Sequence, residues 1–492
     1  MQTKWRVLVA IAFGTYVATM DFSIVNIALP TLSREFDASP DTVIWATLIF
    51  SLTATSLTLT AGRVGDLFGR RRVYLTGWII FTIGMAGVGF TQSIGQLITL
   101  RAVQAIGMSM VVANGTAIVV DAFPASERGR ALGGTNAAVG AGLMSGPILG
   151  GVILSLLDWR AIFYLRVPLG IAVFLMVLLV VRERSSIAAG RRMDIAGALT
   201  LFGALGGTIL AMNRGVAWGW TSPAILGLFA IGVISLVAFI RIEGRSPGPI
   251  ISLALFRIRT FSLSALSLML NFVGQSAVTF LMPFYLIQVL DYSTAHAGLV
   301  IVTIPVLMLA LAPLSGYVAD RFGFRYQQAL GSALVTLGLL SLTTLAADTP
   351  MAAIMARMAL IGLGSAIFQS PNSSAIMGSV PPQQLGTASA SVATSRNIGN
   401  ATGLALMGTI VVAVASSHLG SSAVSTDQIP SDVLLDGIRA GFLAGGAISV
   451  LAVVAAALPT GQPRMESNDA AHAAPAIQQS ASPTDVARAA SD

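Results

Sequence analysis

Cysteine is absent from the 492-residue sequence, and charged residues make up only 10% of it. Without cysteine the chain has no disulfide, thiolate metal site, iron–sulfur cluster or cysteine nucleophile. Its three histidines, His296, His418 and His472, lie too far apart in sequence for metal-ligand spacing. A soluble domain has about 25% charged residues, so this chain has too few to cover a water-facing surface. The composition therefore excludes most cytosolic enzymes, disordered proteins and nucleic-acid binders.

Apolar residues dominate the chain: 55% of it is hydrophobic, and its mean hydropathy is +0.81. The 50 glycines suit helices that pack closely in lipid, where small residues let backbones approach. A bilayer core requires about 20 apolar residues per helix. Fourteen segments meet this requirement: 6–28, 44–62, 73–91, 97–119, 132–156, 162–181, 194–213, 223–241, 262–289, 297–318, 327–346, 351–377, 388–414 and 437–458. The first is too long for a signal-peptide core, so we expect a retained helix.

The basic residues predict the orientation of these helices. An even number of spans places both termini on one side, which we expect to be the cytoplasm. Of the 28 basic residues, 20 then lie in cytoplasmic segments and five, Arg166 among them, at external loops and boundaries. Three stand inside helices: Arg101, Arg357 and Arg396. This asymmetry is the positive-inside pattern of a multi-pass protein of the cell (inner) membrane. It accounts for the net charge of +7, which is therefore no argument for nucleic-acid binding.

An internal repeat divides the chain. The pattern G-x-x-x-D-x-x-G-x-R occurs at residues 62–71 and again at 316–325, 254 residues later. Helices 1–6 therefore correspond to helices 9–14, which predicts two related six-helix halves. The expected parts are an N-terminal bundle (1–186), a linker with two transmembrane helices (187–258), a C-terminal bundle (259–459) and a disordered, polar cytoplasmic tail (460–492).

Four motifs in order give the chain a family resemblance over residues 5–458. They are the run from Met20 to Pro30, the loop at 62–71, Arg101-x-x-Gln104 and the glycine-rich run at 142–151. Together they resemble the fourteen-helix drug:proton antiporter family of the major facilitator superfamily. The resemblance implies an all-α integral membrane fold of two six-helix bundles plus two linker helices. It also implies proton-coupled efflux of hydrophobic or amphipathic drugs by alternating access, driven by the proton gradient and without a cofactor.

Asp21 is the first candidate site residue, because it alone among 21 acidic residues lies well inside a hydrophobic segment. Intramembrane carboxylates are expensive and are usually functional. At 1.5 Å per residue, Asp21 lies about 22 Å from the cytoplasmic edge and Arg101 about 8 Å from the outer edge, which is nearly the same level. We expect the two to pair and to couple transport to protons. The alternative is a static ion pair that joins helices 1 and 4.

Two glycine-rich motifs have mechanical interpretations. In the repeated loop, Gly62 and Gly65 allow close helix approach, and Asp66 is suited to the N-terminus of a helix. The resemblance implies that this loop latches the two halves at the cytoplasmic side in the outward-open state, whereas the alternative is a role in topology and folding alone. We expect the second copy to be more structural. The candidate gating residues are Gly62, Gly65, Asp66, Gly69, Arg70, Arg71, Asp320 and Arg325.

The run in helix 5 has glycines at every fourth residue on one face and a proline that interrupts the backbone ladder. We expect tight packing across the two halves, and the resemblance implies a role in export. Ordinary small-residue packing is the alternative. The motif residues are Gly142, Gly146, Pro147, Gly150 and Gly151.

Further polar residues inside the helices are candidates for a substrate cavity: Asn26, Gln104, Asn271, Gln275, Arg357, Gln369, Asn372 and Arg396. Each amide alone is more often an interhelical hydrogen bond than a ligand contact, and for the two arginines the alternatives are hydrogen bonds to backbone carbonyls or unseen partners. Two departures from the family stand out. Arg166 replaces a usual asparagine, and the helix at 297–318 lacks the carboxylate that some dication exporters have. These features favour neutral, monocationic or amphipathic substrates and leave anionic ones open.

Other functions stay open at this stage. The protein could be a dedicated exporter of an endogenous metabolite or lipid, although the short loop at 347–350 counts against lipid. It could also be a non-transporting membrane sensor. An enzyme is disfavoured, because the sequence has no H-E-x-x-H, no G-x-S-x-G and no paired intramembrane acids.

Overall fold

The computed structural model describes residues 3–38, 40–183, 194–246, 249–251, 253–419 and 430–458, and these contain helices but no β-strand. The expected tail lies outside the described residues. Three short helices are α2 (Pro40–Val43), α7 (Ala161–Tyr164) and α12 (Thr294–Ile301). The long ones are α1 (Thr3–Glu35), α3 (Trp45–Phe68), α4 (Arg70–Val88), α5 (Ile94–Ala122), α6 (Arg128–Leu156), α8 (Val167–Val180), α9 (Ile195–Trp218), α10 (Pro223–Glu243), α11 (Arg259–Phe284), α13 (Thr303–Phe322), α14 (Arg325–Ser341), α15 (Met351–Gly378), α16 (Leu385–Leu419) and α17 (Ser431–Ala457).

The fold is that of an all-α integral membrane protein. The fourteen apolar segments expected from the sequence all lie largely on these helices. Eleven helices of the described part are long and apolar enough to cross a membrane, and α3, α4 and α14 are not among them. Threonine and serine lower the hydropathy of α3, α4 begins with three arginines, and α14, with 17 residues, is too short. The count of fourteen spans therefore stays a prediction.

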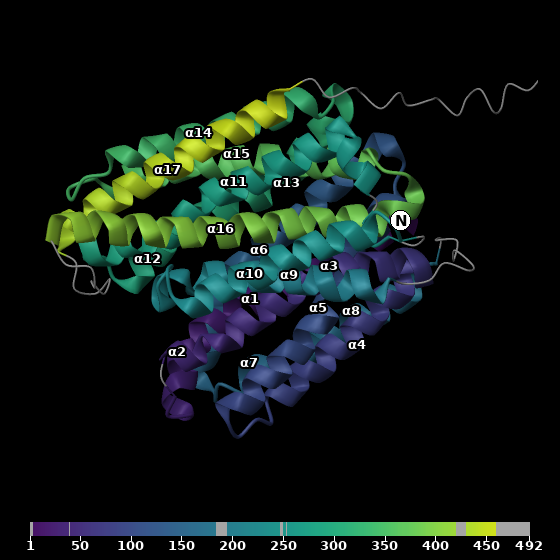
Figure 1. The fold of residues 1–492 in the computed structure, drawn as a ribbon, viewed down its shortest axis with the longest axis horizontal. Coiled ribbons are helices and arrows are strands. Elements are labelled where there is room, and N and C mark those ends of the chain that lie inside the picture. The colour runs from purple at the N-terminus through teal and green to yellow at the C-terminus, as the bar shows by residue number, and fades with distance from the viewer. Residues whose placement is uncertain are drawn as a thin grey trace, which may run out of the picture. The chain divides into compact units, whose positions relative to one another are not determined.

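Residues 1–460 form one compact unit that contains both repeats. One apolar cluster fills the space between α1, α4, α5 and α8, and a second fills that between α11, α14, α15 and α17. The repeats meet where α6 packs on α13 and α16 packs on α3 and α5. In Figure 1, α14, α15 and α17 lie on one side of α16, and α4, α5 and α8 on the other. The proposed domain boundaries stay a prediction.

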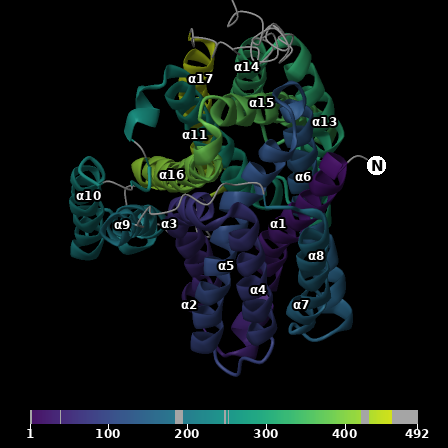
Figure 2. The same cartoon turned by 90° about the vertical axis from the view of Figure 1, so that its right-hand side faces the viewer.

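The two helices between the repeats form a hairpin. α9 and α10 pack along each other, and α9 contacts α3 and α16. Figure 2 shows α10 on the outside of this hairpin, with α9 between it and α3. The hairpin therefore lies beside the two repeats, and its α9 touches one helix from each.

Candidate functional site

Asp21 lies fully buried on α1, between α5 and α8, and the structure places Arg101 against it. Arg101 Nη1 donates to Asp21 Oδ2 at 3.0 Å and to Gln104 Oε1 at 2.7 Å. Gln104 Nε2 donates to Asp21 Oδ1 at 3.1 Å. Arg101 also donates to the Ala46 carbonyl of α3 at 3.1 Å and stacks on the Phe50 ring at 4.0 Å. The cluster of Asp21, Arg101 and Gln104 thus joins α1, α3 and α5.

A second arginine, Arg166, also contacts Asp21, and this contact was not predicted from the sequence. Its Nη1 donates to Asp21 Oδ1, and its Nε donates to the Ile162 carbonyl at 2.7 Å. Only 2% of Arg166 is exposed, and its Nη2 is buried without a hydrogen-bond partner among the described residues. Asp21, Arg101, Arg166 and Gln104 form what we call the Asp21 cluster, whose formal charge is +1.

The position of Arg166 follows from a break in the sixth span. α7 ends at Tyr164 and α8 begins at Val167, so Arg166 occupies the junction within the protein. Trp159 and Phe163, which precede it by seven and three residues, are both buried. Although Trp159 lies in the turn before α7, the spacing of positions 159, 163 and 166 is, in the sequence, that of one helical face. It is the sequence signal that identifies Arg166 as an inward-facing residue.

The glycines of the α6 motif pack against the turn of α1 that holds Asp21. A Cβ at Gly142 would lie 2.7 Å from the Tyr16 carbonyl oxygen, and one at Gly150 would lie 2.8 Å from Ile24 Cγ1. A Cβ at Gly146 would collide with Ser23 Oγ. The expected packing across the halves is therefore wrong for these three glycines. Their face of α6 meets α1, and other glycines meet α13: Gly129, Gly133 and Gly140.

Pro147 lies inside α6, and a Cβ at Gly151 would meet no neighbour within 4 Å. Gly151 is exposed, so it takes no part in the contact with α1. The contact therefore depends on the three glycines at fourth-residue spacing. It holds α6 close to the Asp21 cluster.

Asp66, at the end of α3 and past the apolar segment 44–62, caps a helix of the other repeat. Its carboxylate accepts hydrogen bonds from the backbone N–H groups of Gly386 at 2.9 Å and Thr387 at 3.0 Å, at the start of α16. Arg70 Nε donates to the same carboxylate at 2.9 Å, and Arg70 Nη2 donates to the Pro382 carbonyl. Burial raises the pKa of the Asp66 carboxyl, while Arg70 and the α16 N–H groups oppose that rise.

The close approach of α3 to α16 requires Gly62. A Cβ at Gly62 would lie 2.5 Å from the Gly386 carbonyl oxygen. Gly65 instead faces Asn114 of α5, and Gly69 has φ +102°, a conformation that favours glycine at the turn into α4. Gly62 thereby allows the Asp66 carboxylate to reach the α16 N-terminus.

Asp320, in the second copy of the loop, makes the corresponding contact in the opposite direction. Its carboxylate accepts from the N–H groups of Gly129 at 2.6 Å and Arg130 at 2.8 Å, at the start of α6. Arg71 donates to the Leu178 carbonyl at 2.7 Å, and Arg325 donates to the Ala457 carbonyl at 3.0 Å. We call the end of the molecule with both loops the loop end. There, each repeat caps a helix of the other.

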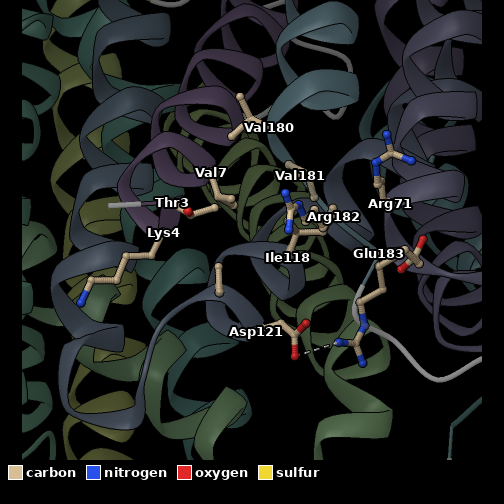
Figure 3. Close-up of a pocket in the computed structure, with 12 residues that line it drawn as sticks. Thr3, Lys4, Val7, Arg71, Ile118, Asp121, Val180, Val181, Arg182 and Glu183 are labelled. Carbon is tan, nitrogen blue, oxygen red and sulfur yellow. Dashed lines mark ion pairs between the residues drawn. The ribbon is translucent and has the colours of Figure 1, made fainter. Parts of the chain in front are cut away.

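A cavity also opens at the loop end, within the first repeat. Figure 3 shows Lys4, Arg71, Arg182, Asp121 and Glu183 around it. The dashed line marks the ion pair between Arg70 and Asp121, 4.0 Å apart. No residue of the Asp21 cluster lines this cavity. We therefore assign it to the loop end and not to a substrate path through the membrane.

The remaining candidate cavity residues divide into three groups. Asn26 is exposed on α1, away from the buried Asp21. Asn271 and Gln275 of α11 form a polar chain with Ser332 and Ser365 of the neighbouring helices. In α15, Asn372 donates to the Ser264 carbonyl at 3.0 Å, and Gln369 faces Met308 Sδ at 4.0 Å. Arg357 and Arg396 form no ion pair with described residues.

Comparisons with known proteins give the family. The sequence profile of the Major Facilitator Superfamily matches residues 11–404 and also 265–487. The riboflavin transporter RibZ of Clostridioides difficile is 35% identical over 406 residues, covering 82% of this chain and 88% of RibZ. The multidrug resistance protein Stp of Mycobacterium tuberculosis is 32% identical over 419 residues, covering 85% of this chain and 78% of Stp. The crystal structure of the human organic anion transporter MFSD10 shares the fold, with a TM-score of 0.65 and 16% identity. The match covers 93% of this chain and 100% of MFSD10.

Proposed function

The chain belongs to the Major Facilitator Superfamily of multi-pass membrane transporters, and we propose that it exports hydrophobic or amphipathic small molecules in exchange for protons. The 32% identity to a multidrug resistance protein supports the export of drug-like compounds. In this proposal the protein lies in the inner membrane with both termini in the cytoplasm. The proton gradient is its energy source, and it needs no cofactor.

The observation that most supports proton coupling is the Asp21 cluster. Asp21 is the one acidic residue well inside an apolar span, and it is fully buried between two arginines. A carboxylate in that position binds a proton when its arginine contacts weaken, and it releases the proton when they form again. Because the cluster joins α1, α5 and α8, movement between these helices changes those contacts.

Alternating access supplies that movement. Asp66 caps α16 and Asp320 caps α6, so the two repeats are held together at the loop end. We propose that this is the outward-open state, and that both caps break when the loop end opens. Proton binding and release at Asp21 then accompany the exchange between the two states.

A dedicated metabolite exporter is the second candidate, and the 35% identity to a riboflavin transporter supports a single metabolite as the substrate. Both candidates are tested by reconstituting the purified protein in proteoliposomes with an imposed proton gradient. A panel of dyes, antibiotics, lipids and riboflavin is then screened by fluorescence-quench proton transport. Movement of several unrelated compounds with protons supports multidrug export, and movement of one metabolite alone supports the second candidate. No proton movement with any compound contradicts the proposal and favours a non-transporting sensor.

A further inference from the structure

The second repeat has no carboxylate in the middle of its helices. Between residues 259 and 458 the acidic residues are all aspartates. Those that the structure describes lie in a loop or close to a helix end: Asp291, Asp320, Asp348, Asp432 and Asp436. Two arginines, Arg357 and Arg396, nevertheless stand inside α15 and α16. Charged groups at membrane depth are costly unless they are paired, or face water or a ligand. These two cations therefore need a counter-charge that their own repeat does not supply.

Arg396 shows this need most clearly. Its guanidinium lies over the Phe272 ring of α11, 5.2 Å from the centroid, and its Nε is buried without a hydrogen-bond partner among the described residues. No described carboxylate lies within ion-pair distance of it. The side chain is only half-buried, so part of it stays accessible. A cation-π contact alone contributes about 0.5–2 kcal/mol, less than the several kcal/mol that desolvation of an ion costs.

The surroundings of Arg396 suit a polar ligand at the junction of the repeats. α16 packs against α3 and α5 of the first repeat as well as α11 of its own. The neighbouring Asn397 donates to Thr55 Oγ1 of α3 at 2.8 Å. On α11, Phe272 is followed one turn later by the half-buried Gln275, whose amide oxygen accepts from Ser365 at 3.0 Å. A cation, an amide and an aromatic ring thus lie on adjacent faces of α16 and α11.

The first repeat does not supply the missing negative charge. Its intramembrane carboxylate, Asp21, already contacts two arginines, and the Asp21 cluster keeps a formal charge of +1. When Asp21 binds a proton, that charge rises to +2. Arg357 adds to the imbalance, because its Nη1 is also buried without a partner among the described residues. The interior is therefore net cationic in either protonation state of Asp21.

We infer that the transported molecule is an amphipathic organic anion whose acidic group binds Arg396 between α16 and α11. This inference rests on the proposed exchange with protons and adds the charge of the substrate. The acidic group of the molecule supplies the counter-charge that Arg396 lacks, and its apolar part contacts the Phe272 side of α11. Guanidinium groups bind carboxylates, sulfonates and phosphates through paired N–H donors, which makes arginine suited to this role.

The test uses one ring system with three charges. Proteoliposomes with the full chain are loaded with 2-naphthalenesulfonate, 2-naphthalenesulfonamide or 2-naphthylmethylammonium, and proton-driven efflux is followed by naphthalene fluorescence. The sulfonate stays ionised over the working pH range, so it does not leak as a neutral acid. We expect the sulfonate to be exchanged for protons at least about tenfold faster than the sulfonamide, the difference of one charge-assisted contact.

Variants separate binding from folding. Arg396→Gln is expected to reduce sulfonate efflux about tenfold or more, and Arg396→Lys to retain a larger part of it because the charge is kept. Arg439→Gln is the matched control, because Arg439 is a partly exposed arginine of the same repeat that already pairs with Asp436. It should transport like the wild type. Equal sulfonate efflux by the wild type and Arg396→Gln would overturn the inference.

The failure of this inference differs from the failure of the proposed function. If the sulfonamide or the ammonium compound is exchanged for protons and the sulfonate is not, the substrate class is wrong but proton-coupled export stands. If none of the three naphthalenes is exchanged, while dyes or riboflavin from the wider panel are, the anion site is likewise contradicted. If no compound moves with protons, both proposals fail.

Discussion

The interiors of the two repeats differ in charge although their helices correspond. The first repeat holds Asp21 between Arg101 and Arg166, whereas the second holds Arg357 and Arg396 without any carboxylate. A repeat thus preserves the helix arrangement while the intramembrane groups diverge. In the proposed function, proton binding belongs to the first repeat, and the cations of the second are suited to a ligand.

The two loops, by contrast, have kept the same contacts. Asp66 caps α16 and Asp320 caps α6, while Arg71 and Arg325 each donate to a carbonyl at the end of the last helix of their own repeat. One contact differs: Arg70 donates to Asp66, and Phe324 stands at the corresponding place in the second loop. The expectation that the second copy is more structural is not supported by this geometry, because both copies join the repeats.

Removing the carboxylate of the first repeat should have the largest effect. We expect Asp21→Asn to abolish proton-driven efflux in everted vesicles, because an amide side chain does not bind and release a proton as a carboxylate does. Exchange of labelled for unlabelled substrate needs no proton and should persist, which shows that the variant is folded. Full efflux driven by a pH gradient in Asp21→Asn would make the Asp21 cluster a static pair that joins helices.

Removing the additional arginine should have an intermediate effect. With Arg166→Asn, Asp21 loses one of its two cations and binds a proton more readily. The pH dependence of transport should therefore shift to higher pH by about one unit, while the maximal rate changes less. Arg160→Asn is the control, since Arg160 lies six residues earlier and pairs with Glu35 and Asp158 near the surface. An unchanged pH profile in Arg166→Asn contradicts the role of this residue.

Breaking one cap at the loop end should have the smallest effect. Asp66→Asn removes the charge that favours the α16 N-terminus, and it should weaken the closed loop end by about 1–2 kcal/mol. Asp320→Asn should weaken it less, because only Asp66 also accepts from Arg70. Asp348→Asn, in an exposed loop, is the control.

Because the chain has no native cysteine, spin labels attach only at the cysteines that are introduced. Spin labels at Phe68→Cys and Tyr326→Cys, which are 53% and 81% exposed, report the distance between the two loops by electron–electron double resonance. We expect longer distances to become more populated in the order wild type, Asp320→Asn, Asp66→Asn. Identical distance distributions in all variants would show that the caps do not latch the repeats.

The sequence allowed some of these contacts to be predicted, and the reasons are specific. Counting residues from the ends of two regular helices placed Asp21 and Arg101 at one depth, and they lie 3.0 Å apart. The contact of Arg166 with Asp21 was not predicted, because the count of basic residues assigned Arg166 to a side of the membrane and not to a partner. The spacing of Gly142, Gly146 and Gly150 predicted a shared face, but periodicity alone does not tell which helix occupies that face. Asp66 was expected at a helix N-terminus, but only the family resemblance, and no pattern in the residues, indicated that the loop joins the two halves.

The central claim, that Asp21 is the group that exchanges a proton for substrate, is tested most directly by proton release on substrate binding. Purified protein in a weakly buffered detergent solution is mixed with a compound that the transport panel has identified, and a pH-sensitive dye reports the change. We predict that the wild type releases protons when the compound binds and that Asp21→Asn, which still binds it, releases none. Equal proton release from the two proteins would contradict the account.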